Sequence, residues 1–204
     1  IIISWSGYKE SVMSSKINIC EVLKGHFRTL RDADTKKVSI WDIFTFIILP
    51  FIIAASFSIF GRGITKDLIS LLVNFSAILT ALLLSVLVLV YDQESKIRQR
   101  KDIDTFYESK KSLLTELYYN ICYSILCGVL LVVLCFIVSL YSVDPSGYFY
   151  GGTHEYFFDK ANVTFKLNVL SHILCPLIIY VCIHLILNII MIVKRMHALL
   201  TLDS

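Results

Sequence analysis

The residues that could support chemistry are few, and most of them lie in apolar surroundings. His172, His184 and Asn188 fall in a long apolar run near the C-terminal end. His184, Asn188 and Arg195 would lie near one face of a helix. This spacing favours imidazoles that hydrogen-bond a neighbouring helix. The alternative is a polar seam that becomes hydrated or protonated when the protein is active.

No set of residues has the spacing of a catalytic or metal site. His154-Glu155 would begin a zinc motif only with a second histidine four residues later, where the chain has Phe158. Asp144 and Asp159, taken with that pair, could bind a metal, but their spacing is unspecific. The sequence also lacks a phosphate-binding glycine loop, a nucleophile elbow and paired intramembrane carboxylates. We therefore expect no enzymatic activity, no cofactor and no metal.

Six cysteines raise the question of a disulfide framework. Cys20 lies in the N-terminal segment. The other five lie in apolar runs: Cys122, Cys127, Cys135, Cys175 and Cys182. None falls in the connections that we assign to the outside of the cell. We expect them to be reduced and to act as small apolar packing residues.

Four apolar runs must position all of these residues. Hydrophobic residues make up 56% of the 204 residues and charged residues only 17%, where a soluble domain carries about 25% charged residues. A membrane-spanning helix needs roughly 20 mostly apolar residues. We predict an all-α, polytopic membrane protein with spans at 41–60, 68–91, 117–141 and 170–193. Residues 1–40 form a cytoplasmic segment, and 41–204 form the transmembrane domain.

The basic residues predict the orientation of these spans. The segments before the first span, between the second and third, and after the fourth hold 15 of the 19 Lys and Arg residues. Cytoplasmic connections carry such an excess. We therefore predict that both termini and the loop 92–116 are cytoplasmic, with the aromatic loop 142–169 outside. No charged residue lies in the middle of a span, which disfavours ion-coupled transport.

Two stripes of small and polar residues predict how the second and third spans pack. Small residues let membrane helices approach closely. The second span carries Ser70, Asn74, Ala77, Ala81 and Ser85, and the third carries Ser124, Gly128, Cys135 and Ser139. These stripes fit a tight antiparallel hairpin or a contact between protomers. A pore lining is the less favoured alternative.

Two prolines should bend the first and fourth spans. Pro50 removes the amide that would bond the carbonyl of Phe46, and Pro176 does the same to His172. We therefore expect two backbone carbonyls that need partners other than the usual helical amide.

The parts outside the membrane are also expected to be largely helical. Residues 14–33 predict an amphipathic helix with Ile17, Cys20, Leu23, Phe27 and Leu30 on its apolar stripe, which lies on the membrane surface or docks on the cytoplasmic loop or a partner. Loop 92–116 should extend the neighbouring spans as a cytoplasmic helical hairpin. The outer loop, with Gly151-Gly152, should form a hairpin or a short helix at the interface.

The cytoplasmic hairpin carries the cations that we expect to contact lipid headgroups or a protein partner. These are Lys96, Arg98, Arg100, Lys101, Lys110 and Lys111. Acidic residues are interleaved among the basic ones, which leaves little excess charge in this segment. Direct binding of nucleic acid is therefore disfavoured.

The stretch from Leu68 to Lys96 (LISLLVNFSAILTALLLSVLVLVYDQESK), which leads into a basic helical segment, resembles small multi-spanning membrane effectors of bacterial antiphage operons, including retron-type ones. The resemblance implies an effector that a cytoplasmic partner holds inactive. On release, such an effector perturbs or permeabilises the inner membrane, as in abortive infection, without catalytic residues. We expect a homo-oligomer or a cytoplasmic protein partner. The alternative is a non-catalytic scaffold, or a channel or transporter subunit, of a larger membrane complex.

Overall fold

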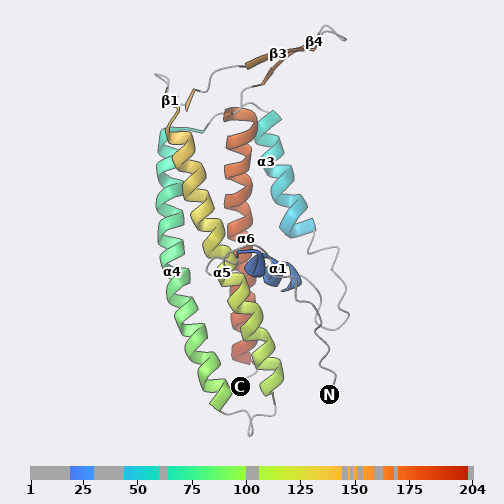
Figure 1. Ribbon diagram of the computed structural model, residues 1–204, viewed down its shortest axis with the longest axis vertical. Coiled ribbons are helices and arrows are strands. Elements are labelled where there is room, and N and C mark those ends of the chain that lie inside the picture. The colour runs from blue at the N-terminus through green and yellow to red at the C-terminus, as the bar shows by residue number, and fades with distance from the viewer. Residues whose placement is uncertain are drawn as a thin grey trace, which may run out of the picture.

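Long helices run side by side along the molecule in the computed structural model, and one short helix crosses them (Figure 1). The structure describes residues 19–29, 44–59, 64–99, 106–143, 147, 149–150, 154–158, 163–167 and 170–201. The helices are α1 (Ile19–Thr29), η1 (Phe44–Ile48) with α3 (Leu49–Ile59), α4 (Lys66–Gln99), α5 (Tyr107–Ser139), and η2 (Leu170–Leu174) with α6 (Cys175–Thr201).

Three helices of the described part are long and apolar enough to cross a membrane: Lys66–Gln99, Tyr107–Ser139 and His172–Thr201. At 1.5 Å per residue, α4 and α5 are each about 50 Å long, whereas the hydrocarbon layer is about 30 Å thick. The prediction that these two helices continue beyond the apolar spans is therefore confirmed. The first predicted span corresponds to a shorter apolar helix, Phe44–Phe57.

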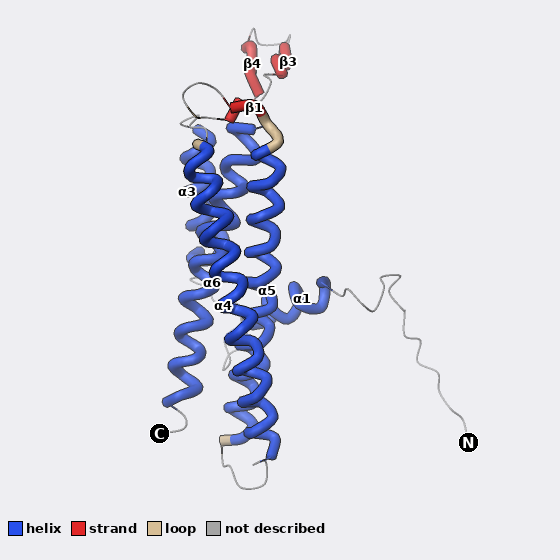
Figure 2. Tube along the Cα trace, turned by 90° about the vertical axis from the view of Figure 1, so that its left-hand side faces the viewer, coloured by secondary structure: helices blue, strands red, loops and turns tan. Residues whose placement is uncertain are grey.

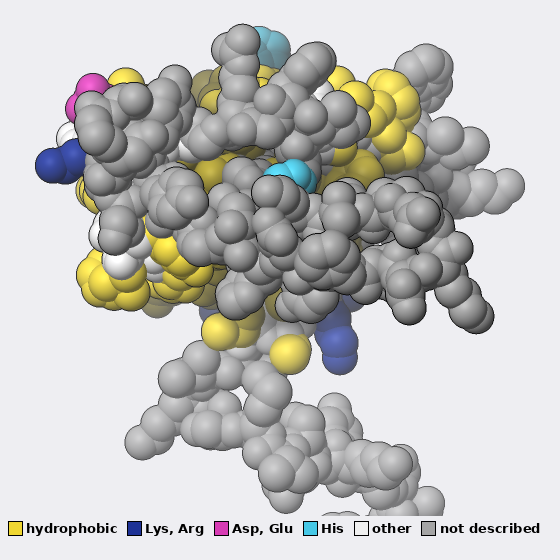
Figure 3. Space-filling model, turned by 90° about the horizontal axis from the view of Figure 1, so that it is seen from above, with side chains coloured by type: hydrophobic (Ala, Val, Ile, Leu, Met, Phe, Trp, Pro, Cys, Tyr) yellow, Lys and Arg dark blue, Asp and Glu magenta, His cyan; other side chains and the backbone are white. Residues whose placement is uncertain are grey.

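The helix α5 packs against both α4 and α6. It lies between them at the end near the strands and crosses α6 towards the other end (Figure 1). The helix α3 packs on α6, and its short length leaves it beside only one half of that helix. Large apolar side chains are exposed on the outer surfaces, among them Phe51, Leu71, Ile78, Val88 and Ile190. Seen from above, hydrophobic side chains also form much of the described surface (Figure 3). Such a surface suits lipid and indicates that the chain resides in a membrane.

Both prolines that interrupt the predicted spans follow a π-helical turn. The turn η1 ends two residues before Pro50, and η2 ends two residues before Pro176. A proline ring crowds the carbonyl four residues earlier and offers it no amide. A wider π-turn at this place accommodates the ring without ending the helix. The structure thus shows how both helices absorb their prolines.

The contact between α4 and α5 depends on close approach at Gly128. The Ser76 hydroxyl donates a hydrogen bond of 2.7 Å to the Gly128 carbonyl. A Cβ atom at position 128 would lie 2.5 Å from Thr80 Oγ1, much closer than two such atoms pack. The predicted stripe of α5 is therefore largely a packing face, because Ser124, Gly128 and Cys135 are buried. Ser139 is exposed and donates to the Cys135 carbonyl at 2.9 Å.

The predicted stripe of α4 lies outside this contact. All five of its residues are exposed: Ser70, Asn74, Ala77, Ala81 and Ser85. α4 instead presents larger buried side chains to the rest of the chain, including Ile69, Leu72, Leu83 and Val90, with Ser76 among them. Small residues on α5 leave room for these side chains, so the two small stripes do not need to face each other. The contact between protomers stays a prediction.

The loop 142–169, predicted to lie outside the cell, contains short antiparallel strands that the all-α prediction did not include. Strand β1 (Ser142–Val143) pairs with β2 (Phe149–Tyr150), and β3 (His154–Phe158) pairs with β4 (Val163–Leu167). Of the two predicted forms of this loop, the structure shows a hairpin. Gly147 has a φ of 81°, which glycine adopts readily, and its carbonyl accepts a 3.0 Å bond from the Lys66 amide.

The close approach at Gly128 makes a first prediction. Gly128→Ala should force α4 and α5 apart, and overpacking of this kind costs about 1–3 kcal/mol. The melting temperature of the purified protein in detergent should fall by several degrees, and Thr80→Ala in the same chain should restore most of the loss. Leu130→Ala on the exposed side of α5 is the matched control. An unchanged melting temperature in Gly128→Ala would contradict this account.

Candidate functional site

The N-terminal helix α1 lies across the bundle and packs on α5 (Figures 1 and 2). Its buried side chains are His26, which is completely buried, and Thr29. Gly25 permits the close approach, because a Cβ atom there would overlap the ring of Tyr119. The amphipathic helix expected at 14–33 therefore exists over the described residues Ile19–Thr29. It docks chiefly on residues of the predicted third span, Tyr119, Asn120 and Tyr123, a place that the prediction did not include.

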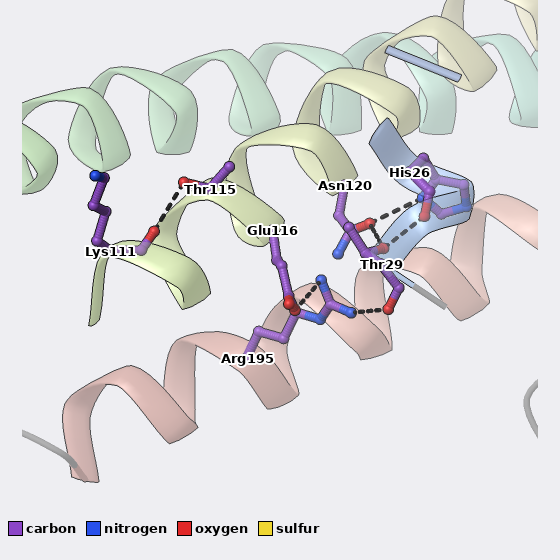
Figure 4. Close-up of polar contacts among 7 residues, drawn as sticks. All are labelled: His26, Thr29, Lys111, Thr115, Glu116, Asn120 and Arg195. Carbon is purple, nitrogen blue, oxygen red and sulfur yellow. Dashed lines mark hydrogen bonds and ion pairs between the residues drawn. The ribbon is translucent and has the colours of Figure 1, made fainter. Parts of the chain in front are cut away.

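Three polar side chains fix α1 to α5 (Figure 4). His26 Nδ1 lies 2.9 Å from Asn120 Oδ1, and this oxygen accepts the hydrogen bond. Thr29 Oγ1 lies 2.9 Å from the same oxygen and 2.7 Å from the His26 carbonyl. Asn120 is also completely buried. These side chains therefore form hydrogen bonds with one another in place of hydrogen bonds with water, and the loss of one would leave the others without a partner.

Arg195 of α6 joins the same contact from the other side (Figure 4). Its guanidinium donates to the Thr29 carbonyl at 2.7 Å and pairs with Glu116 of α5 at 3.1 Å. The side chains of Arg195 and Glu116 are only 14% and 33% exposed. Thr29 is the last residue of α1, so the cation also lies at the negative end of the helix dipole.

A second set of contacts continues from α1 towards η1. The rings of His26 and Tyr123 are stacked with centroids 3.8 Å apart. The Tyr123 hydroxyl lies 2.8 Å from His184 Nε2, and His184 Nδ1 lies 3.0 Å from the Phe46 carbonyl. A carbonyl only accepts, so Nδ1 carries the proton and Nε2 accepts from the tyrosine. The carbonyl of Phe46, which we expected to lack a helical donor because Pro50 has no amide hydrogen, thus accepts a hydrogen bond from His184 of α6.

The side chains from Glu116 to His184 form a continuous set that we call the polar row. It comprises Glu116, Asn120 and Tyr123 of α5, His184, Asn188 and Arg195 of α6, and His26 and Thr29 of α1. Asn188 Nδ2 donates to the His184 carbonyl at 2.8 Å.

Several buried polar atoms along the polar row have no protein partner within the described part of the chain. These are His26 Nε2, Asn120 Nδ2, Asn188 Oδ1 and, one turn from Asn120, Ser124 Oγ. Buried groups of this kind usually bond to water. The interior beneath α1 is therefore polar enough to hold water.

The environment of His26 keeps its imidazole neutral. Burial disfavours the charged form and lowers the pKa of His26 from 6.5 to about 4, against the hydrogen bond to Asn120, which raises it. Electrostatic interactions with the His184 ring and with the Arg195 guanidinium lower the pKa of His26 further. At neutral pH the contact between α1 and α5 thus contains no buried positive charge on His26.

Two of the three residues of the predicted polar seam lie in the polar row. His184 and Asn188 are buried together, as their shared helical face predicts. His172 lies in η2, away from them, beside an apolar groove of about 550 Å³ between α3 and the start of α6. The prediction that the imidazoles bond a neighbouring helix holds for His184, which bonds both α5 and η1.

The predicted cations of α4 are exposed and paired within their own helix. Lys96 lies 2.7 Å from Asp92, and Arg98 lies 2.9 Å from Glu94. Exposed pairs at this spacing contribute little to stability. They lie at the end of the helical extension, and their contact with a partner or with headgroups stays a prediction.

The predicted cations of α5 differ from one another. Lys110 is only 7% exposed, because it lies on the same face of α5 as the buried residues Leu114 and Leu117. We predicted that Lys110 contacts headgroups or a partner, but its side chain is turned into the bundle instead. Lys111 is exposed, and its ammonium lies 5.7 Å from the centre of the Tyr107 ring. Arg100 and Lys101 lie outside the described residues.

The candidate metal ligands of the outer loop are not tested. His154 and Glu155 lie on β3, but the structure does not describe their side chains, and Asp144 and Asp159 lie outside the described residues. Elsewhere in the described part, no group of three or more His, Cys, Asp or Glu side chains could hold a metal ion. All six cysteines are free, and three of them are buried as expected: Cys127, Cys135 and Cys175.

Sequence reasoning missed the residues that bring α1 into the site. Of the predicted apolar stripe, Leu23 is half-buried and packs against the core, but Cys20 and Phe27 are exposed, Phe27 to 51%. The buried face is the neighbouring one with His26 and Thr29. One signal was present in the sequence, because Asn120 is an amide near the start of the third apolar run, where it needs a partner.

The shared oxygen of Asn120 makes a second prediction. Asn120→Leu should leave His26 and Thr29 buried without their acceptor, which costs about 1–3 kcal/mol. Hydrogen exchange of the α1 amides should become faster, while the core of α4 keeps its protection. Tyr118→Leu, an exposed position on α5, should leave α1 unchanged. Equal protection of α1 in both variants would contradict the assigned role.

The depressed pKa of His26 makes a third prediction about pH. Between pH 6.5 and about 4, undocked α1 binds a proton that docked α1 does not, so docking is strongest above pH 6.5. It should weaken by up to about 1.4 kcal/mol for each pH unit below that value. Protection factors of the α1 amides, which correct for intrinsic exchange, should fall accordingly. In His26→Gln this dependence should disappear, and its persistence would rule out His26 as the titrating group.

No protein-family model, no curated protein and no solved structure matches this chain. The geometry of the polar row and of the helices that carry it is therefore the basis for any functional conclusion.

Proposed function

We propose that the chain is a membrane-acting effector that perturbs or permeabilises the bacterial inner membrane when a cytoplasmic partner releases it, as in abortive antiphage defence. The observation that supports this proposal is that α1 covers the members of the polar row that lie on α5 and α6. His26 and Thr29 of α1 are the groups that occupy the Asn120 oxygen. Removing α1 would therefore leave the row without its cover.

An uncovered polar row could not stay in contact with lipid. Unpartnered polar groups are costly in hydrocarbon, and Asn120, Tyr123 and Arg195 would all lose contacts to α1. Water or another helix would have to satisfy them. Membrane helices exchange partners at small cost, since lipid and helix contacts are similar in energy. Release of α1 would thus favour a hydrated or rearranged bundle, which is a route to permeability without catalysis.

The proposal includes four crossings with both ends in the cytoplasm. Phe44–Ile59 would be the first, and at 1.5 Å per residue it is about 24 Å long. It packs beside α6, and its π-turn is bonded to His184. The excess of basic residues supports the same orientation. The end of α4, the start of α5 and the end of α6 lie towards one end of the bundle, opposite the strands (Figure 1).

This proposal is tested by displacing α1 in living cells. Gly25→Leu would overlap Tyr119 and lift α1 from α5. Induced in bacteria loaded with a voltage-sensitive dye, it should collapse the membrane potential sooner than the wild-type chain and admit propidium iodide. Cys20→Leu adds a similar side chain at an exposed position of the same helix and should behave as wild type.

Two outcomes would count against the effector. If neither the wild-type chain nor Gly25→Leu changes the potential at equal expression, the chain does not act on the membrane in this way. If Cys20→Leu depolarises as fast as Gly25→Leu, the release of α1 is not the cause. Hydrogen exchange of purified Gly25→Leu must show loss of α1 protection for the comparison to apply.

A second candidate is a non-catalytic scaffold, or a channel or transporter subunit, of a larger membrane complex. The exposed stripe of α4 favours it, because Ser70 and Asn74 would otherwise face lipid, and small residues promote contact between membrane helices. Such a subunit should be harmless when induced and should co-purify with a membrane complex. Ala77→Leu and Ala81→Leu should then break that association, whereas they should not alter the docking of α1.

A further inference from the structure

A polar groove of about 550 Å³ lies between α1 and the part of α5 that extends beyond the apolar run. One side is formed by Lys24, Gly25 and Arg28, which recur at helical spacing on α1. The other side is formed by Lys111, Ser112 and Thr115 of α5. Sites for small ligands commonly have volumes of about 300–1,000 Å³, so a molecule of that size would contact both helices at once.

Within the described part of the chain, the basic side chains of this groove lack carboxylate partners, whereas one of its acidic side chains has a basic partner. Glu116 lines it but is already paired with Arg195. Lys24, Arg28 and Lys111 are exposed, and none of them has a carboxylate partner within the described residues. The remaining acidic residues of the lining are Glu21 and Glu108. Three unpaired cations from two helices therefore outweigh two carboxylates in a concave site.

From this juxtaposition we propose that the groove binds a phosphate-bearing ligand and that the bound ligand clamps α1 onto α5. The phosphate would lie between Lys24 and Arg28 on one side and Lys111 on the other, and the Ser112 hydroxyl would donate to it. Arg and Lys are the side chains that recognise phosphate. Glu108 would accept a hydrogen bond from an N–H or O–H group of the same ligand, which favours a ligand with a donor beside its phosphate.

Two sources of such a phosphate can reach the groove. α1 lies where the apolar part of α5 gives way to charged residues, so a phospholipid headgroup with a glycerol or amine would be within reach. A soluble nucleotide carries the same chemistry. The chemistry of the site is common to both, and the experiment must separate them.

The consequence is that ligand binding and the docking of α1 are linked. A ligand that binds only when both walls are present stabilises docked α1 by mass action. This extends the proposed function, because it would make release of α1 depend on the ligand. The binding itself does not depend on any membrane damage and can be measured in the purified chain, so either proposal can fail without the other.

The test uses the full chain purified in detergent. Native mass spectrometry measures retention of phosphatidylglycerol against phosphatidylcholine, and isothermal titration measures binding of ATP. The variant Lys24→Gln, Arg28→Gln and Lys111→Gln removes the three cations. The control removes two exposed, paired cations of α4, Lys96→Gln and Arg98→Gln, and adds Lys194→Gln, an exposed cation of α6. Circular dichroism confirms that both variants remain folded.

The expected result is that one of the two probes binds the wild-type chain and protects the α1 amides from exchange. At about 1 kcal/mol for each cation, the groove variant should bind on the order of 100-fold more weakly, whereas the control should bind as wild type. Retention of the lipid alone identifies a headgroup, and binding of ATP alone identifies a soluble phosphate compound. Failure of both probes to bind, or equal losses in the two variants, would overturn the proposal.

Discussion

The structure depends on one constraint, which is that a polar group inside an apolar bundle must find its partner within the protein. Pro50 creates such a need at the Phe46 carbonyl, and the His184 imidazole satisfies it. The other nitrogen of the same ring bonds Tyr123, so a single neutral side chain joins η1, α5 and α6. Because each partner leaves the others unsatisfied if it moves, these three elements are held in a single arrangement. The proline thus helps to specify the packing of the helices as well as bending one of them.

The helix α1 is attached to this arrangement by a different balance of forces. Its contact with the bundle combines one shared amide oxygen, one stacked ring and a backbone carbonyl bound by Arg195 with two half-buried apolar side chains, Val22 and Leu23, that pack against the core. The apolar side chain of Phe27 faces outward and can enter the headgroup region of a membrane. A helix with apolar side chains on both of these sides can leave the bundle for the headgroup region without exposing them to water. This is the property that a releasable cover requires.

The sequence indicated the long helices well and their contacts less well. The apolar runs of α4, α5 and α6 are long enough that composition alone predicts them, and the prolines correctly marked Phe46 as a carbonyl in need of a donor. The docking face of α1 could not be derived, because helical periodicity describes how apolar residues are distributed and not which face meets a partner. His26 is buried only because Asn120, 94 residues later, is there to receive it. The stripe of α4 shows the same limit. The spacing of Ser70 and Asn74 along the helix fits packing on α5 and packing on another chain equally well.

The contacts of α1 also determine when it can take its place during synthesis. It is the first described helix in the chain, yet Arg195, which binds its last carbonyl, follows Thr29 by 166 residues. At 5–20 residues per second, the chain needs roughly 8–33 s to travel that distance. Throughout this interval α1 is made but has no complete site to occupy, so a cytoplasmic protein that recognises it meets no competition from the bundle. The first helix of the described part is therefore among the last elements to reach its docked position.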